Sequence, residues 1–186
     1  MKKAVVAIGL CLGAFSLPAT ATEKMYGTFG VGYADTEFSQ QSKDGMSYNL
    51  AIGHQFMSQW YIELGYQQIV DEQQSVESMK ADALYLAILG KAGSYNGELF
   101  YKLGVMNVDV AGVERMGESA SCGIGESISD SGLCRYDEGS LAGVIGLGYD
   151  YHLGLRSMLR LEYNYIGGEN DLKAHLVNIG FRYNFN

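Results

Sequence analysis

The ten residues Ser-Met-Leu-Arg-Leu-Glu-Tyr-Asn-Tyr-Ile, at positions 157–166, alternate apolar and polar side chains. Leucine or tyrosine occupies each odd position from Leu159 to Tyr165, and Arg160 and Glu162 stand between them. Side chains point to opposite faces along a β-strand, so a period of two predicts a strand with one apolar face. This stretch therefore predicts a strand whose two faces meet different surroundings.

The same period of two recurs along the chain, most clearly over residues 60–67, 99–105 and 177–185. Pro18 is the only proline, which suits strands because proline cannot donate a hydrogen bond to a neighbouring strand. Each candidate strand has about the 9–11 residues that a tilted strand needs to cross a bilayer. Eight strands are predicted, over residues 25–34, 47–56, 60–69, 81–90, 98–109, 139–149, 157–166 and 173–185.

The two strand faces distinguish a membrane barrel from a soluble β-barrel, in which the apolar face would form the core. The less apolar face is small rather than charged, as a narrow lumen requires, at Thr28, Gly30, Gly32, Ala142, Gly146 and Gly148. The apolar face carries aromatic residues near the strand ends, as membrane interfaces favour, at Tyr33, Tyr48, Trp60, Tyr66, Tyr101, Tyr149, Tyr165 and Phe185. We therefore predict an all-β fold, an eight-stranded antiparallel up-and-down transmembrane β-barrel, with a soluble β-barrel as the alternative.

The first segment has the pattern of a secretory signal peptide. Two lysines precede an apolar stretch, residues 4–15, which is shorter than the ~20 residues of a membrane-spanning helix. The small residues Ala19-Thr20-Ala21 follow. We predict cleavage after Ala21, which makes residues 1–21 a signal peptide and residues 22–186 the barrel domain.

The chain is acidic, with 21 Asp and Glu residues against 13 Lys and Arg and a formal net charge of -8. This balance excludes a nucleic-acid-binding module, which would carry a basic stripe, and a hydrophobic content of 47% excludes a disordered chain. Four alternate connections hold 14 of the acidic residues and four basic ones, namely residues 35–46, 70–80, 110–138 and 167–172. In outer-membrane barrels such connections are extracellular, so the outer surface is predicted to be acidic.

Three stretches in the C-terminal part carry a family resemblance. They are Gly146-Leu-Gly-Tyr-Asp-Tyr151, Leu159-Arg-Leu-Glu-Tyr-Asn-Tyr165 and Val177-Asn-Ile-Gly-Phe-Arg-Tyr-Asn-Phe185. With them the chain resembles the small outer-membrane β-barrels, which include opacity-like proteins and the membrane domain of outer membrane protein A. One departure is Asn186, which follows the aromatic residue on which the family usually ends. The resemblance implies an integral protein of a Gram-negative outer membrane.

Cys122 and Cys134 are the cysteines that remain after the predicted cleavage, and both lie in the longest predicted external loop. In an exported protein such a pair predicts a disulfide, because thiols outside the cytoplasm meet an oxidising environment. Redox chemistry would instead be expected from a Cys-x-x-Cys motif. The pair is predicted to be a structural link within the loop.

Five charged residues fall on the predicted inner face, and they are Glu63, Lys102, Arg160, Glu162 and Arg182. Isolated charges at membrane depth are costly, so these side chains are expected to pair. Glu162 and Arg182 lie on neighbouring strands and are expected to pair with each other. An eight-stranded lumen is just wide enough for side chains, which predicts a plug of ion pairs. A narrow ion-conducting channel is the alternative.

An enzyme is the competing class of function, because some eight-stranded barrels modify lipid A. A hydrolytic site needs a nucleophile such as serine within reach of an oriented base. His54, His152 and His175 lie at a strand end, in a turn and on an outward face, and no serine shares a strand face with any of them. No catalytic site is predicted.

The predicted function is that of a structural and surface-interaction protein. Its external loops, chiefly residues 110–138, would contact a host factor, a phage or lipopolysaccharide. Loop carboxylates such as Asp130, Asp137 and Glu138 match no calcium-loop pattern, so no metal is predicted. Outer-membrane lipids and lipopolysaccharide are the expected surroundings, and the chain is expected to be a monomer without cofactor or nucleic acid.

Overall fold

The computed structural model describes residues 24–38, 41–73, 78–115, 126–128, 133–169 and 172–185. Within these ranges no helix is long and apolar enough to cross a membrane. The elements described are β1 (Met25–Phe38), β2 (Gln41–Met57), β3 (Trp60–Gln73), β4 (Ser78–Gly93), β5 (Gly97–Arg115), β6 (Glu126–Ile128), β7 (Leu133–His152), β8 (Ser157–Gly168) and β9 (Lys173–Asn184).

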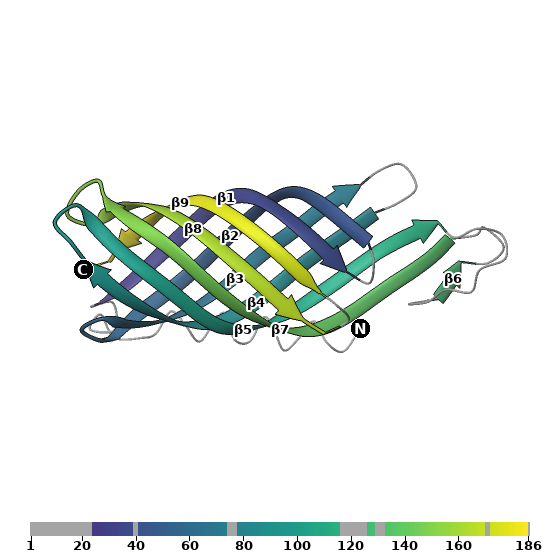
Figure 1. Cartoon of the computed structure of the whole chain (residues 1–186), viewed down its shortest axis with the longest axis horizontal. Helices are drawn as coiled ribbons and strands as arrows, with labels where there is room; N and C mark the ends of the chain where they lie inside the picture. Colours follow the sequence, from purple (N-terminus) through teal and green to yellow (C-terminus); the bar gives the residue numbers. More distant parts are fainter. Residues whose placement is uncertain are drawn as a thin grey trace.

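The strands close into a barrel (Figure 1). Strands β1 to β5 pair in chain order, and β7 to β9 do the same, always antiparallel. Pairing of β1 with β9 and of β5 with β7 joins the two sets into a ring. The short β6 pairs with β7 alone and stands outside the ring. The predicted eight-stranded antiparallel barrel is confirmed, and a closed ring leaves no free strand edge inside a bilayer.

Compared with a soluble protein, the barrel has the opposite arrangement, with apolar side chains outside and polar side chains inside. On β5, Leu103 is 64% exposed on the outside of the barrel, while its neighbour Lys102 is 4% exposed inside. The predicted apolar faces of β3, β5, β8 and β9 all point outward, and many of their side chains are exposed. This arrangement suits hydrocarbon around the barrel and a polar interior, and it rules out the soluble β-barrel alternative.

Glycines stand opposite the large side chains that fill the lumen. The register pairs Gly65 with Tyr85, and a Cβ atom added to that glycine would lie 2.5 Å from the tyrosine ring. Gly148 faces Phe100 in the same way, with 2.4 Å between the added atom and the ring. A narrow barrel holds a large interior residue only where its cross-strand neighbour is small, which is one reason why the chain contains 25 glycines.

The two ends of the barrel differ. At one end, here called the turn end, tight connections at residues 58–59, 94–96 and 153–156 join the strands. At the other, the hairpin end, β5 and β7 continue as a pair until Arg115 faces Leu133. This extension projects beyond the other strands, with β6 at its tip (Figure 1).

The strands are longer than predicted, so three predicted loops are partly wrong. Pairing of β1 with β2 continues to Phe38 and Gln41, within the predicted loop 35–46. Strands β3 and β4 likewise extend into residues 70–80, and β5 and β7 into residues 110–138. The prediction used the length that crosses a bilayer, but backbone hydrogen bonding between neighbouring strands continues beyond it.

Candidate functional site

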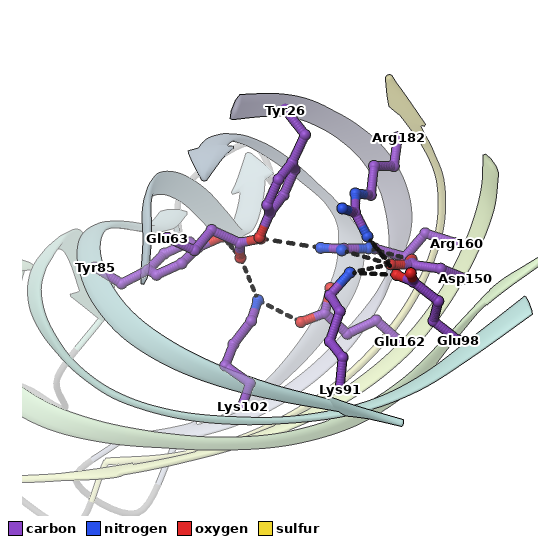
Figure 2. A network of polar contacts seen from close by, with 10 residues as sticks. All are labelled: Tyr26, Glu63, Tyr85, Lys91, Glu98, Lys102, Asp150, Arg160, Glu162 and Arg182. Atoms are coloured by element: carbon purple, nitrogen blue, oxygen red, sulfur yellow. Dashed lines mark hydrogen bonds and ion pairs between the residues drawn. The ribbon is translucent and has the colours of Figure 1, made fainter. Parts of the chain in front are cut away.

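The candidate site is a network of charged side chains inside the barrel (Figure 2). It lies in the half nearer the turn end, because Glu63, Lys91 and Asp150 are within a few residues of the connections there. The structure places all five residues of the predicted lumen network there, each 4% exposed or less: Glu63, Lys102, Arg160, Glu162 and Arg182. Alternation along β3, β5, β8 and β9 positions them, since each occupies an inward-facing position. The network is therefore assembled from strands that are far apart in the sequence.

Asp150, on β7, is the principal acceptor of this network. Its Oδ1 accepts from Nε of Arg160 at 2.7 Å, and its Oδ2 accepts from Nζ of Lys91 at 2.7 Å. Nη1 of Arg182 donates to the same Oδ2 at 2.8 Å. One fully buried carboxylate thus accepts hydrogen bonds from three cationic side chains, which come from β4, β8 and β9.

Glu63, on β3, is a second acceptor on the opposite side of the lumen. Nζ of Lys102 lies 2.9 Å from its Oε1, and Nη1 of Arg160 lies 3.0 Å from its Oε2. The hydroxyls of Tyr26 and Tyr85 donate to its two oxygens at 2.8 and 2.9 Å. Arg160 therefore bridges the two acceptors, and both oxygens of Glu63 are satisfied.

The expected pairing of Glu162 with Arg182 is wrong. Strands β8 and β9 are neighbours, but their register places Met158 opposite Arg182 and Asn178 opposite Glu162. Lys102 is instead the ionic partner of Glu162. Arg182 forms ion pairs with Asp150 and with Glu98 instead. Its Nη1 lies 2.9 Å from Oε2 of Glu98. Strand adjacency predicted neighbours correctly, but it could not predict the register.

Sequence reasoning missed three charged members of the network, namely Lys91, Glu98 and Asp150. The predicted strands ended at Gly90 and Tyr149, one residue before Lys91 and Asp150. Both residues continue the inward alternation of β4 and β7, so extending that pattern by one position would have found them. Glu98 lay inside a predicted strand, on the same face as Lys102.

The network balances its charges. Four acids, Glu63, Glu98, Asp150 and Glu162, face four bases, Lys91, Lys102, Arg160 and Arg182. Aromatic rings line the cations, with the guanidinium carbon of Arg182 4.1 Å from the Tyr26 ring centroid. That of Arg160 lies 4.5 Å from the Phe100 ring centroid. Equal numbers of both signs satisfy the requirement that buried charges be compensated.

The half of the lumen nearer the hairpin end holds apolar side chains together with uncharged polar ones such as Thr36, Gln68 and Ser140. Its buried apolar side chains are Ala34, Ile69, Ala81, Val108, Val110, Ala142, Val144, Ile166, Leu172, Ala174 and Leu176. A cavity of about 10 Å³, room for about one water molecule, is lined by Lys102 and Asn164 on its polar side and by Val144 on its apolar side. Among the described residues, the buried side chains therefore change from charged to uncharged along the barrel.

The remaining candidate residues lie apart from this network. Cys122 is outside the described residues, so its disulfide with Cys134 stays a prediction. His175 is on the outer face, where its Nδ1 lies 2.8 Å from the hydroxyl of Tyr163. His152 is in contact with the carbonyl oxygen of Tyr95, and His54 is exposed. Among the described residues, no group of three or more acids, histidines and cysteines could hold a metal ion.

Comparison with known proteins identifies the family in which a polar lumen and an apolar exterior are expected. A family profile described as "Outer membrane protein beta-barrel domain" matches residues 7–185. The chain belongs to this family. No curated protein sequence matches it.

Solved structures of outer membrane barrels have the same fold. Neisserial surface protein A (NspA) is 16% identical, with a TM-score of 0.62 over 88% of this chain and 98% of that one. The N-terminal β-barrel domain of OprF from Pseudomonas aeruginosa is 13% identical, with a TM-score of 0.56 over 87% and 98%. Ail, the attachment invasion locus protein of Yersinia pestis, is 15% identical, with a TM-score of 0.53 over 86% and 98%, in a complex with the heparin analogue sucrose octasulfate.

Family membership places this barrel in the outer membrane of a Gram-negative bacterium as an integral protein. Barrels of this class have short turns on the periplasmic side and longer segments outside the cell. The turn end, with residues 58–59, 94–96 and 153–156, is thus the periplasmic end. By the same rule, we expect the hairpin of β5 and β7 to lie outside the cell.

Proposed function

We propose that this outer membrane barrel is a surface-interaction protein, in which a plugged lumen supports an external contact surface. The observation that carries the proposal is the β5–β7 hairpin. Partners of β7 on the β8 side begin at Ala142, so residues 133–141 extend past the end of β8. At about 3.4 Å per residue the extension is roughly 30 Å long. On the other edge, β4 pairs with β5 as far as Val113, so the hairpin is held by a neighbouring strand and presents a defined surface at this end of the barrel.

The sequence of the external segments supports a partner with positive charge. The connections that the sequence assigned to the outside hold 14 acidic and four basic residues. Complementary potentials steer association, so a basic protein surface on a host cell or a phage fits this end. A sulfated polyanion does not fit, and we expect no binding of sucrose octasulfate to this barrel.

Deletion of residues 112–136 tests the contact surface. These residues form the tip of the hairpin, from Gly112 to its cross-strand partner Tyr136. We expect the deletion to abolish binding of surface proteins to the reconstituted barrel, because the contact surface is removed. Binding would be measured by pull-down with tagged barrel in nanodiscs, identification by mass spectrometry and titration of each captured protein. Capture by wild type should weaken as salt rises, since exposed charges are screened.

A matched variant separates the contact from folding. Shortening the turn at residues 94–96 changes the periplasmic end and should leave capture unchanged. Both variants should keep the heat-modifiable gel mobility of a folded barrel, because the ring of strands closes without the hairpin. Equal capture by wild type and the hairpin deletion would contradict the proposal, and capture of lipopolysaccharide alone would assign the hairpin to a lipid partner.

The lumen is proposed to be closed to ions. Eight paired charges occupy its periplasmic half, and uncharged residues such as Val108, Ser140 and Leu176, each 0% exposed, fill the other half. Planar-bilayer recordings of the wild-type barrel should show no steady conductance, because side chains fill the narrow lumen of an eight-stranded barrel. Stable open channels would instead support the ion-conducting alternative.

A further inference from the structure

The turn between β4 and β5, residues 94–96, ends in an asparagine that a glycine follows. Asn96, next to Gly97, is the only asparagine of the sequence in such a position. Asparagine is a labile residue, because its side-chain amide can react with the backbone nitrogen of the following residue. Glycine favours this reaction, since it has no Cβ to hinder the approach or to restrict the backbone. The dipeptide therefore carries a reactive pair of groups.

The structure leaves the Asn96 side chain accessible. Asn96 is exposed, and Tyr95 beside it is 98% exposed. The amide of Ser94 donates to the carbonyl oxygen of Gly97 at 2.7 Å. The amide of His152, in β7, donates to the carbonyl oxygen of Asn96 at 3.1 Å. Both bonds use carbonyl oxygens as acceptors, so they anchor the turn without engaging the nitrogen of Gly97.

We propose that this turn makes Asn96 a site of spontaneous deamidation in the folded barrel. The nitrogen of Gly97 loses its proton to water and attacks Cγ of Asn96. The C–N bond of the side-chain amide then breaks, and the released nitrogen takes up a proton and leaves as ammonia. The product is a cyclic succinimide, and water opens it at either carbonyl carbon to give aspartate or isoaspartate. Water is the only reactant consumed, and no oxidant or reductant takes part.

The reaction changes the periplasmic end in two ways. Either product adds a negative charge to the turn, close in the chain to Glu98. In isoaspartate the main chain runs through Cγ, so the backbone carbonyl that accepts from His152 becomes a free carboxylate. The contact between the β4–β5 turn and the end of β7 is then altered, whereas the strands of the ring keep their pairing. This inference goes beyond the proposed surface interaction, which concerns the opposite end.

Pairing within a strand is expected to suppress the same reaction. Asp44 also precedes a glycine and is exposed, but it lies within β2, where Gly45 faces Ala34 of β1. Ring closure needs the chain to bend at the reacting residue, and the extended backbone of a paired strand does not allow this. Asp44→Asn therefore places an Asn-Gly dipeptide in a paired strand, as a matched control for the turn.

Incubation in water enriched in heavy oxygen tests the proposal. The barrel, folded in phospholipid vesicles, would be incubated, returned to ordinary water, digested and analysed by mass spectrometry. We expect the label at residue 96 of the wild type to rise with time to several-fold the background measured at Asn107, which lies in β5. Label at residue 44 of Asp44→Asn should stay at that background. After unfolding in urea both dipeptides should react, because the strand no longer restrains residue 44.

A second variant assigns the label to the asparagine side chain. Asn96→Gln keeps an amide at the turn, but its longer side chain would have to close a larger and less favourable ring. The label at residue 96 should therefore be lost, while heat-modifiable mobility shows that the variant is folded. Labelling of Asn96 only after unfolding overturns the proposal. Equal labelling of residue 44 in folded Asp44→Asn also overturns it, because the turn would then not select the site.

Discussion

Asp150→Asn is expected to lower the free energy of unfolding of the barrel by about 3–5 kcal/mol, the cost of breaking a buried ion pair. The reason is that the carboxylate is 0% exposed and accepts from Lys91, Arg160 and Arg182. An amide has nearly the same shape, but it leaves three buried cations with insufficient negative charge. Equilibrium urea unfolding of the barrel in lipid, followed by fluorescence and by gel mobility, measures the effect.

Two variants make this result specific to the network. Asp109→Asn, on the exposed outer face near the external end, should change stability by less than about 0.5 kcal/mol. Adding Lys91→Met to Asp150→Asn should recover part of the loss, because one uncompensated cation is removed. A barrel that tolerates Asp150→Asn as well as Asp109→Asn would show that the ion pairs add nothing to stability.

Gly32→Ala is expected to impair closure of the barrel between β1 and β9. A Cβ atom at this position would lie 2.1 Å from the carbonyl oxygen of Val177 and 2.8 Å from Cα of Asn178. Backbone atoms cannot rotate away as a flexible side chain can, so the two strands would have to separate. Overpacking costs about 1–3 kcal/mol or more, and here it acts on a pairing that closes the ring.

Gly143→Ala is the matched control for that substitution. It also lies within a strand, but its added Cβ would have no neighbour nearer than 3.8 Å. We expect folding yield and unfolding midpoint close to those of wild type for Gly143→Ala, and a clear loss of both for Gly32→Ala. Equal yields for the two variants would mean that the strands adjust to the extra methyl group.

Several parts of the structure follow from short stretches of sequence. Alternation over residues 157–166 correctly predicted which side chains face lipid and which face the lumen, because the period of two is a local property of an extended chain. The count of the eight strands in the ring and their order also followed, since short connections force successive strands to be antiparallel neighbours. The short β6, within the predicted loop 110–138, was not predicted. Small residues such as Gly30 on the inner face indicated a narrow barrel for the same local reason.

The contacts between charged side chains inside the lumen could not be predicted from local sequence patterns. Arg160 and Glu63 are 97 positions apart in the chain, and their contact exists only because the ring of strands closes. Lys91 and Asp150 were missed because each predicted strand ended at about the length that crosses a bilayer. In the structure, backbone pairing continues through both residues.

By itself, the sequence determined the ring strands, which of their faces is apolar and the outer membrane as their environment. These features depend on residue type and on a period of two. Only the tertiary structure decided that Arg182 pairs with Asp150 and Glu98 rather than with Glu162. The physical reason is that a partner across the lumen depends on the register of every strand pair around the ring. A shift of one residue in any of these pairs would turn an inward charge outward, and no local pattern specifies the sum of all registers.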